Sequence, residues 1–359
     1  KSNRNPTFRS KFSEDIFNLK YSHQGCDTWS QLASTLVKDV CGSLREKELD
    51  LLSRDEQRQL RKYITDLKFV PGGRYLYYAG RSNRYYNNCF LLKAEEDTRE
   101  DWANLSWKSE SCLMTGGGIG VDYSVYRESG RTLAGTGGVA SGPIPKMEMI
   151  NSIGAKVMQG GSRRSAIYAS LNWKHNDVPS FLTAKDWDRI PVGNTGLTLK
   201  QIKEQDFNFP APLDMTNISV NYDTEWLLNY WNTGDVGETF LENVKQALHS
   251  AEPGFSFNFM ENENDTLRNA CTEVCSADDS DVCNLGSINL GRIESVTELA
   301  DVDELATKFL ICGTLRAQLP YKKVYDVREK NRRLGLGLMG MHEWLVKRGH
   351  KYEVTDELH

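Results

Sequence analysis

The sequence predicts an α/β fold in which strands and helices alternate after a helical N-terminal region. Up to about residue 70, apolar side chains recur at helical spacing on a charged background. A Pro-Gly-Gly break follows at 71–73, and from there to about residue 222 short apolar runs bounded by glycine turns alternate with helical stretches. This alternation favours a parallel sheet or barrel whose chemistry lies in loops at the strand ends.

The expected elements follow in order. Residues 28–41 begin with Thr28 and Gln31 at capping-box spacing, and residues 44–67 repeat the helical pattern. Short apolar runs with glycine turns occur in "NNCFLL" (87–92), "GGGIGVDYSV" (116–125), "GTGGVASGPIP" (135–145) and "MQGGSRRSAIYASL" (158–171), and strands are expected among these runs. Further helices are expected at 141–158, 224–250, 301–318 and about 325–348.

Composition narrows the class of protein. The 359 residues carry a net charge of −5, which argues against binding a nucleic-acid polymer because such binding calls for a concentrated basic face. No run approaches the roughly 18 apolar residues of a membrane helix. The first residues lack the apolar core of a signal peptide. We therefore expect a cytoplasmic protein, in the host cytoplasm if the gene belongs to a phage, with no membrane contact.

Cysteines gather in "RNACTEVCSADDSDVCNLGSINL" (268–290), which holds Cys271, Cys275 and Cys283. A reducing cytosol argues against a disulfide framework. A structural zinc site wants four ligands, and no second cysteine pair or histidine lies near this cluster. Redox chemistry is therefore the favoured interpretation. Cys275 is interpreted as a small buried hydrophobe.

Several motifs, in this order, resemble the catalytic chain of ribonucleotide reductase: "PGGRYLYYAG…NNCFLL", "GGGIGVDYSVYRESG", "NACTE" and "CNLGSINL". "EKNRRLGLGLMG" (329–340) resembles a further helix of the same barrel. The resemblance implies a helical region over 1–70 and, from 71 to 359, a ten-stranded α/β barrel of two parallel half-barrels with a finger loop at about 265–280. It places the rest of the barrel, a phosphate-binding loop and a cysteine-bearing tail beyond residue 359, and no N-terminal ATP-sensing domain is expected.

The resemblance implies reduction of ribonucleotides to 2′-deoxyribonucleotides for DNA synthesis by a thiyl radical. Cys271 would be the thiyl, Glu273 the general base on the 3′-hydroxyl, and Asn269 a hydrogen-bonding partner of the ribose. If this stretch is extended, the three side chains share one side of it. Cys89 and Cys283 would close into a disulfide during reduction, and a thioredoxin- or glutaredoxin-like protein would reopen it.

The resemblance also assigns binding residues. Loops 131–138 and 159–165 would relay the identity of a deoxynucleoside triphosphate or ATP effector to the substrate. Substrate-binding residues would be Asn88, Gly118 and Ser141, and effector-binding residues would be Asp97, Thr98, Arg127, Arg163 and Arg164.

The radical source is left open between adenosylcobalamin, which the motifs slightly favour, and a ferritin-like, metal-containing beta subunit. The absence of a long insertion after "GGGIGVDYSV" favours a homodimer. Two other readings are a catalytically incomplete nucleotide-binding remnant and a zinc protein. The intact Asn269, Cys271 and Glu273 argue against the remnant.

Overall fold

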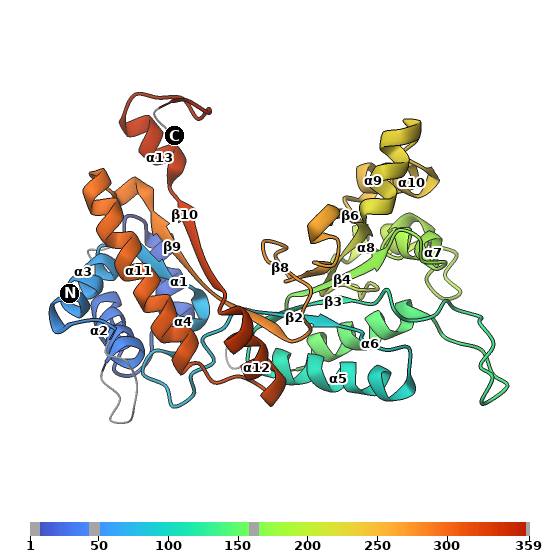
Figure 1. Ribbon diagram of the computed structural model, residues 1–359, viewed down its shortest axis with the longest axis horizontal. Coiled ribbons are helices and arrows are strands. Elements are labelled where there is room, and N and C mark those ends of the chain that lie inside the picture. The colour runs from blue at the N-terminus through green and yellow to red at the C-terminus, as the bar shows by residue number, and fades with distance from the viewer. Residues whose placement is uncertain (1–7, 43–50, 158–164, 357–359) are drawn as a thin grey trace. The chain divides into compact units, whose positions relative to one another are not determined.

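The computed structural model describes residues 8–42, 51–157 and 165–356, which form two compact units (Figure 1). The first unit comprises residues 1–88 and 282–359, and the second comprises residues 89–281. These units do not divide at residue 70, where the composition of the sequence changes. Among the described residues, no helix has the length and apolar character needed to cross a membrane.

The first unit packs helices against a small sheet. Strand β1 (Phe69–Pro71) pairs antiparallel with β9 (Asp281–Asn289), and β10 (Leu334–Met339) pairs parallel with β9. The helices α2, α3 and α11 pack on one another through buried aliphatic and aromatic side chains. The helices of this unit are α1 (Lys11–Lys20), α2 (Trp29–Cys41), α3 (Arg54–Thr65), α4 (Gly73–Tyr78), η3 (Leu290–Arg292), α11 (Val296–Arg316), α12 (Lys322–Asn331) and α13 (Met341–Lys347).

Capping decides where the N-terminal helices begin. The predicted capping box of α2 is confirmed, because Thr28 Oγ1 accepts the Gln31 N–H at 3.3 Å and Gln31 Oε1 accepts the Thr28 N–H at 3.0 Å. The helix predicted over 44–67 is not continuous, because residues 51–53 are not helical and α3 begins at Arg54. Ser53 and Glu56 form a second capping box there, which satisfies the free N–H groups of the first turn. Residues 43–50 lie outside the described part.

The helix predicted over about 325–348, including the motif 329–340, is wrong in its middle. Helix α12 ends at Asn331, its C-cap Arg332 has a left-handed φ of 49°, and Leu334–Met339 then form strand β10 beside β9. Glycine permits this approach. A Cβ on Gly335 would lie 2.3 Å from Leu285 Cδ2 and 3.0 Å from the Asn284 carbonyl oxygen.

The second unit is a parallel half-barrel of strands in the order β2-β3-β4-β5-β6. Helices α5 and α6 pack side by side against one face of it (Figure 1). The predicted α/β barrel class is thereby confirmed. The elements of this unit are β2 (Cys89–Lys93), α5 (Arg99–Met114), β3 (Gly118–Asp122), α6 (Pro143–Lys156), β4 (Ile167–Asn172), α7 (Val178–Leu182), η1 (Trp187–Arg189), α8 (Leu199–Gln205), β5 (Thr216–Tyr222), α9 (Thr224–Thr233), α10 (Glu238–Ser250), β6 (Gly254–Phe257), η2 (Met260–Asn262), β7 (Leu267–Arg268) and β8 (Cys275–Ser276).

The helix predicted over 224–250 is two helices. Gly234, with φ of 73°, ends α9 in the left-handed conformation, and α10 begins only at Glu238. A glycine at this position is the usual helix stop, because other residues pay a steric cost there.

The finger loop (residues 265–280) rises from the half-barrel on a two-stranded stem. Its strands β7 and β8 pair antiparallel, with Leu267 opposite Ser276. The stem crosses β3 at Gly120, where an added Cβ would lie 1.7 Å from the Arg268 carbonyl oxygen and 2.8 Å from its carbonyl carbon. Backbone rather than a movable side chain occupies that space, so β3 admits the loop only if residue 120 has no side chain.

We predict that Gly120→Ala lowers the unfolding midpoint in urea, because the extra methyl group must displace the stem. Overpacking of this kind costs about 1–3 kcal/mol. Gly135→Ala is the control, since an added Cβ there meets no atom within 4 Å. A Gly120→Ala midpoint equal to that of the control would contradict the close approach.

Candidate active site

The tip of the finger loop is a tight turn rather than an extended strand. The Thr272 N–H donates to the Asn269 carbonyl at 3.0 Å, and Thr272 has a left-handed φ of 70°. The expectation that 269, 271 and 273 share one side of an extended segment is therefore wrong. Asn269 is fully buried, whereas Cys271 and Glu273 are exposed.

The side chain of Asn269 explains the turn. Its Oδ1 accepts the Val274 N–H at 3.0 Å, which is the local bond by which asparagine favours turns over strands. Its Nδ2 donates to Cys89 Sγ at 3.3 Å. Asn269 thus ties the loop tip to β2. A ribose contact by Asn269 stays a prediction.

Two thiols meet beneath the loop tip. Cys89, the first residue of β2, is 4% exposed, and its thiol is hydrogen-bonded to that of Cys271. This hydrogen bond, together with burial and the nearby charge of Glu273, holds the pKa of Cys89 well above its ordinary value. Cys89 is therefore a protonated thiol at neutral pH. Cys271 beside it remains exposed.

The other predicted redox cysteine belongs to the first unit. Cys283 lies in β9, is 2% exposed, and its thiol donates to the Asn284 carbonyl at 3.3 Å. Its own carbonyl accepts the Asn88 N–H at 3.2 Å. Asn88 Oδ1 is buried and has no hydrogen-bond partner within the described residues. The pairing of Cys89 with Cys283 and the substrate role of Asn88 stay predictions.

Gly118 has a packing reason to be glycine. An added Cβ would lie 3.1 Å from the Ala166 carbonyl oxygen and 3.2 Å from Ala270 Cβ in the finger loop. Strand β3 therefore packs against the loop at both Gly118 and Gly120. Contact between Gly118 and substrate stays a prediction.

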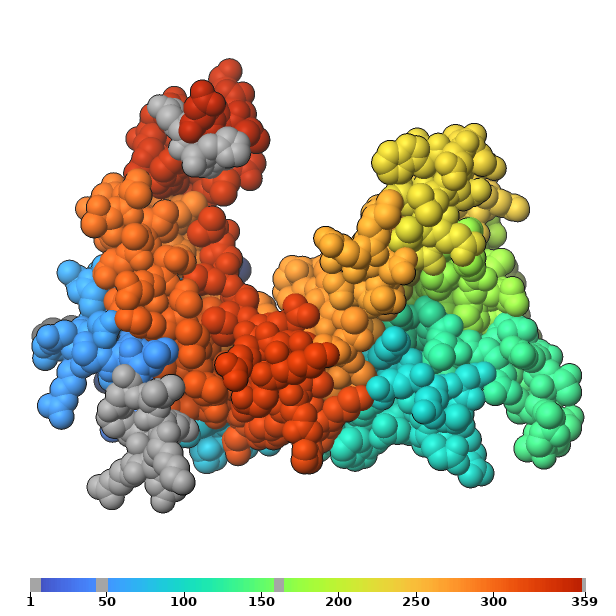
Figure 2. Space-filling view, in the orientation of Figure 1, coloured from blue at the N-terminus to red at the C-terminus, as the bar shows by residue number. Residues whose placement is uncertain are grey.

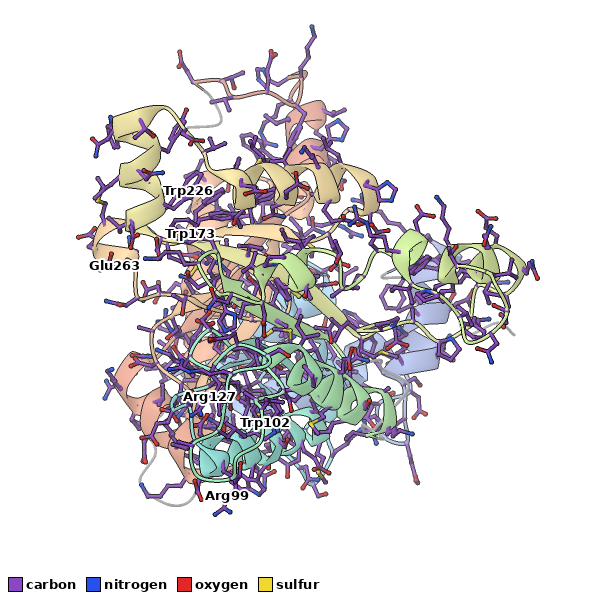
Figure 3. All side chains as sticks on the ribbon, turned by 90° about the vertical axis from the view of Figure 1, so that its right-hand side faces the viewer. Arg99, Trp102, Arg127, Trp173, Trp226 and Glu263 are labelled. Carbon is purple, nitrogen blue, oxygen red and sulfur yellow. The ribbon has the colours of Figure 1, made fainter. Side chains whose placement is uncertain are left out.

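A cavity of about 230 Å³ in the second unit is lined by the described residues of the predicted effector site. Asp97, Thr98 and Arg127 line it, and Ser141, predicted to bind substrate, lies in the same wall. Arg127 Nε donates to Asp97 Oδ2 at 2.6 Å, and Thr98 caps α5 by accepting the Asp101 N–H at 3.1 Å. Figure 3 shows Arg127 near Trp102, with Arg99 at the lower edge of the unit, and both Trp102 and Arg99 also line the cavity. Arg163 and Arg164 lie outside the described residues.

The predicted relay loop 131–138 borders this cavity. It is a largely exposed loop that projects from the second unit (Figures 1 and 2). The Leu133 N–H donates to the Gly138 carbonyl at 2.8 Å, and Leu133 and Val139 line the cavity. Of the second loop, 159–165, only residue 165 is described.

Sequence reasoning missed the residues that hold the finger loop. Arg268 donates to Ser256 Oγ at 2.6 Å and to Asn258 Oδ1 at 2.8 Å, and its guanidinium also contacts Cys275. Cys275 is half-buried beside this charge, unlike the buried hydrophobe expected. An arginine just before the "NACTE" motif was the available signal.

A buried ion pair supports the end of the loop. Lys108 Nζ lies 2.9 Å from Asp279 Oδ1, and the two side chains are 3% and 2% exposed. Asp279 Oδ1 also accepts the Lys93 N–H at 2.8 Å. Their separation of 171 residues left no sequence signal for this pairing.

We predict that iodoacetamide modifies Cys271 faster than Cys89 at pH 8. Alkylation requires an exposed thiolate, and the raised pKa of Cys89 keeps that thiol protonated even above its ordinary value of 9.0. Peptide mass spectrometry over time measures both rates, with the fully buried Cys112 as the unreactive control. Equal rates at Cys89 and Cys271 would contradict this arrangement.

Comparisons with known proteins place the chain in a family. A family model described as "Ribonucleotide reductase, barrel domain" matches residues 87–202 and 225–358. The chain is 27% identical over 298 residues to a vitamin B12-dependent ribonucleoside-diphosphate reductase of Thermoplasma acidophilum, covering 79% of this chain and 38% of that protein. A Mycobacterium tuberculosis protein of the same description is 28% identical over 307 residues, covering 81% and 43%.

A second kind of relative is also similar. The ribonucleoside-diphosphate reductase large subunit of Danio rerio is 24% identical over 331 residues, covering 82% of this chain and 42% of that protein. The chain thus spans about two fifths of the length of these curated relatives. The family match covers well over half of the chain, including the strand of Cys89, the finger loop and the strand of Cys283. The chain therefore belongs to the ribonucleotide reductase family.

Proposed function

We propose that this chain carries the catalytic centre of a thiyl-radical ribonucleotide reductase. The observation that carries the proposal is the contact of the Cys89 and Cys271 thiols, braced by Asn269 and with the charge of Glu273 nearby. The relatives named above are described as ribonucleoside-diphosphate reductases, which favours diphosphate substrates.

The environments of these groups suit distinct steps. Cys271, exposed at the loop tip, takes the 3′ hydrogen as a thiyl radical and later returns it. Glu273 accepts the proton of the 3′-hydroxyl. Cys89, a thiol with a raised pKa, gives the proton with which the 2′-hydroxyl leaves as water. Cys89 and Cys283 together supply two electrons and close into a disulfide, which a thioredoxin- or glutaredoxin-like dithiol reopens.

The exposure of Cys271 fits a radical delivered from outside the chain. Adenosylcobalamin, when bound, would supply that radical to the Cys271 sulfur. We favour it over a ferritin-like beta subunit because three relatives described as vitamin B12-dependent are 27–28% identical, against 23–25% for five relatives with other descriptions.

We propose that the cavity of Asp97, Thr98 and Arg127 binds a nucleotide effector. Its volume of about 230 Å³ is below the roughly 300–1,000 Å³ of typical ligand sites, so further walls are needed. A second copy of the chain would supply them. Helices α5 and α6 leave Trp107, Met114 and Met149 each at least 53% exposed, an apolar surface that a homodimer would cover.

We predict that Glu273→Gln slows nucleotide reduction by about 10²–10⁴-fold, because glutamine keeps the shape but cannot accept the proton. Cys271→Ser should abolish reduction, since a hydroxyl cannot carry the radical. Deoxynucleotide formation is measured on the complete natural protein with a dithiol reductant.

Glu263→Gln, an exposed change just before the finger loop, is the matched control and should retain turnover. Measurable product from Cys271→Ser, or near-normal rates for Glu273→Gln, would refute these roles. Nucleotide binding without turnover by the natural protein would instead favour a nucleotide-binding remnant.

We predict that Asp97→Ala lowers affinity for a deoxynucleoside triphosphate effector at least about tenfold. The variant leaves Arg127 without its carboxylate, and loss of a charged hydrogen bond costs about 1.5–3 kcal/mol. Equilibrium binding measures the effect, with the exposed pair variant Glu225→Ala as control. An unchanged binding isotherm for Asp97→Ala would count against this site.

A further inference from the structure

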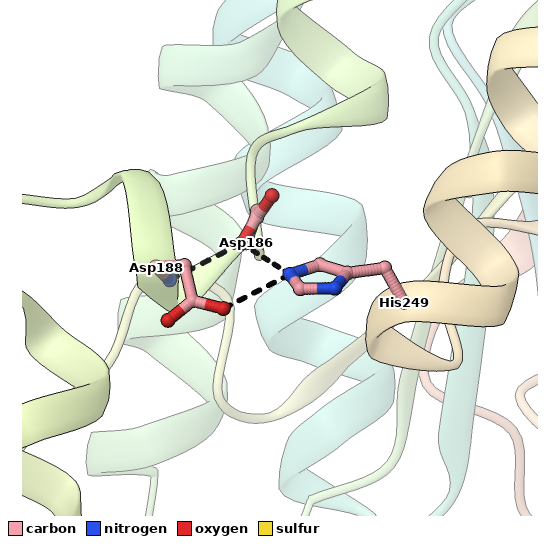
Figure 4. Close-up of side chains that lie close together, drawn as sticks. All are labelled: Asp186, Asp188 and His249. Carbon is pink, nitrogen blue, oxygen red and sulfur yellow. Dashed lines mark hydrogen bonds and ion pairs between the residues drawn. The ribbon is translucent and has the colours of Figure 1, made fainter.

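A second cluster of polar side chains lies in the second unit, apart from the catalytic cysteines and the effector cavity. Asp186 immediately precedes η1, Asp188 lies within it, and His249 lies in the last turn of α10. His249 Nε2 is 3.0 Å from Asp188 Oδ2 and 3.5 Å from Asp186 Oδ1 (Figure 4). One ligand atom from each residue lies within 4.8 Å of the others.

The two separations from His249 to the carboxylates fit ligands around one metal ion. Bonds of about 2.0–2.2 Å place neighbouring tetrahedral or octahedral ligands about 3.0–3.6 Å apart. The donor set is one imidazole nitrogen and two carboxylate oxygens. Imidazole suits zinc, cobalt and similar transition metals, whereas magnesium and calcium prefer oxygen ligands alone.

The present partners of the two carboxylates can be replaced by a bound cation. Asp186 is 3% exposed, and its arginine partner is Arg189, at 3.2 Å, whose side chain is 67% exposed. Lys200 Nζ lies 3.1 Å from Asp188 Oδ2, and the Lys200 side chain is 51% exposed. This contact lowers the pKa of Asp188. Exposed long-chain pairs of this kind are weak, so a bound metal ion can replace them at small cost.

Two further features favour a bound ion. His249 lies at the C-terminal end of α10, where the helix dipole favours positive charge. All three residues also line a cavity of about 810 Å³, together with Trp187, Lys203 and Phe207. An ion held by three protein ligands would therefore keep open positions toward a space large enough for a small molecule.

We propose that Asp186, Asp188 and His249 bind a divalent transition-metal ion of the zinc or cobalt class at the wall of this cavity. Part of the cavity wall, including Phe207 and Asp214, falls between the two segments that match the family model. The proposed site has all three of its ligands within the matched segments. It does not depend on the proposed reductase activity.

Titration of the chelator-treated protein with Co²⁺ tests the site, with bound metal counted by equilibrium dialysis and the visible spectrum of the ion recording its ligands. We expect one equivalent bound by the natural protein, and an affinity at least tenfold weaker for His249→Ala and for Asp188→Asn. Zn²⁺ should compete for the same equivalent and raise the melting temperature of the natural protein but not of the variants.

The control is His342→Ala, which removes an exposed imidazole from the first unit and should leave Co²⁺ affinity unchanged. Circular dichroism shows whether each variant is folded. If His249→Ala misfolds, the isosteric Asp188→Asn decides the outcome. Full Co²⁺ affinity in a folded Asp188→Asn variant, or no stoichiometric binding by the natural protein, would overturn the proposal. Because no turnover is measured, failure here leaves the reductase assignment intact.

Discussion

The arrangement of the two thiols depends on one steric constraint, which is the close approach of the finger loop to strand β3. The Arg268 carbonyl oxygen occupies the space that a side chain at residue 120 would fill, and Ala270 lies against Gly118 in the same way. Two glycines on one face of a strand thus let the backbone of the loop lie directly on the sheet. Arg268 then stabilises the stem by donating charged hydrogen bonds to Ser256 and Asn258.

This close approach gives two adjacent thiols different chemistry. Cys89 is fixed in a buried strand, where hydrogen bonding to Cys271 and burial favour the neutral thiol. Cys271 lies on a turn that Asn269 holds from below, so its sulfur stays accessible while its position is fixed. One strand and one turn therefore place two side chains of the same residue type in different environments, one buried and one exposed.

Much of the fold and the local motifs could be predicted from the spacing of apolar residues, because helices and strands each repeat apolar side chains at their own interval along the sequence. The helix from Trp29 to Cys41 and its capping box needed only neighbours in the chain. The strand at Leu334–Met339 was missed for two reasons. It forms by pairing with β9, a partner distant in sequence, and its glycines do not show the alternation of apolar and polar residues that indicates a strand. The turn at Asn269 was missed because an asparagine side chain overrode the alternation expected of a strand.

The sequence by itself determined the family motifs, the identities of the cysteines and the acidic and amide residues beside them, since these are properties of residue type and order. Only the tertiary structure decided that Cys89 meets Cys271, that Asp97 pairs with Arg127, and that Asp186 and Asp188 lie beside His249. Such contacts join residues 30 to 182 positions apart in these three cases, and the packing of strands and helices selects among the many possible partners. The protonation of a thiol follows from that packing, because burial and hydrogen bonding set its pKa.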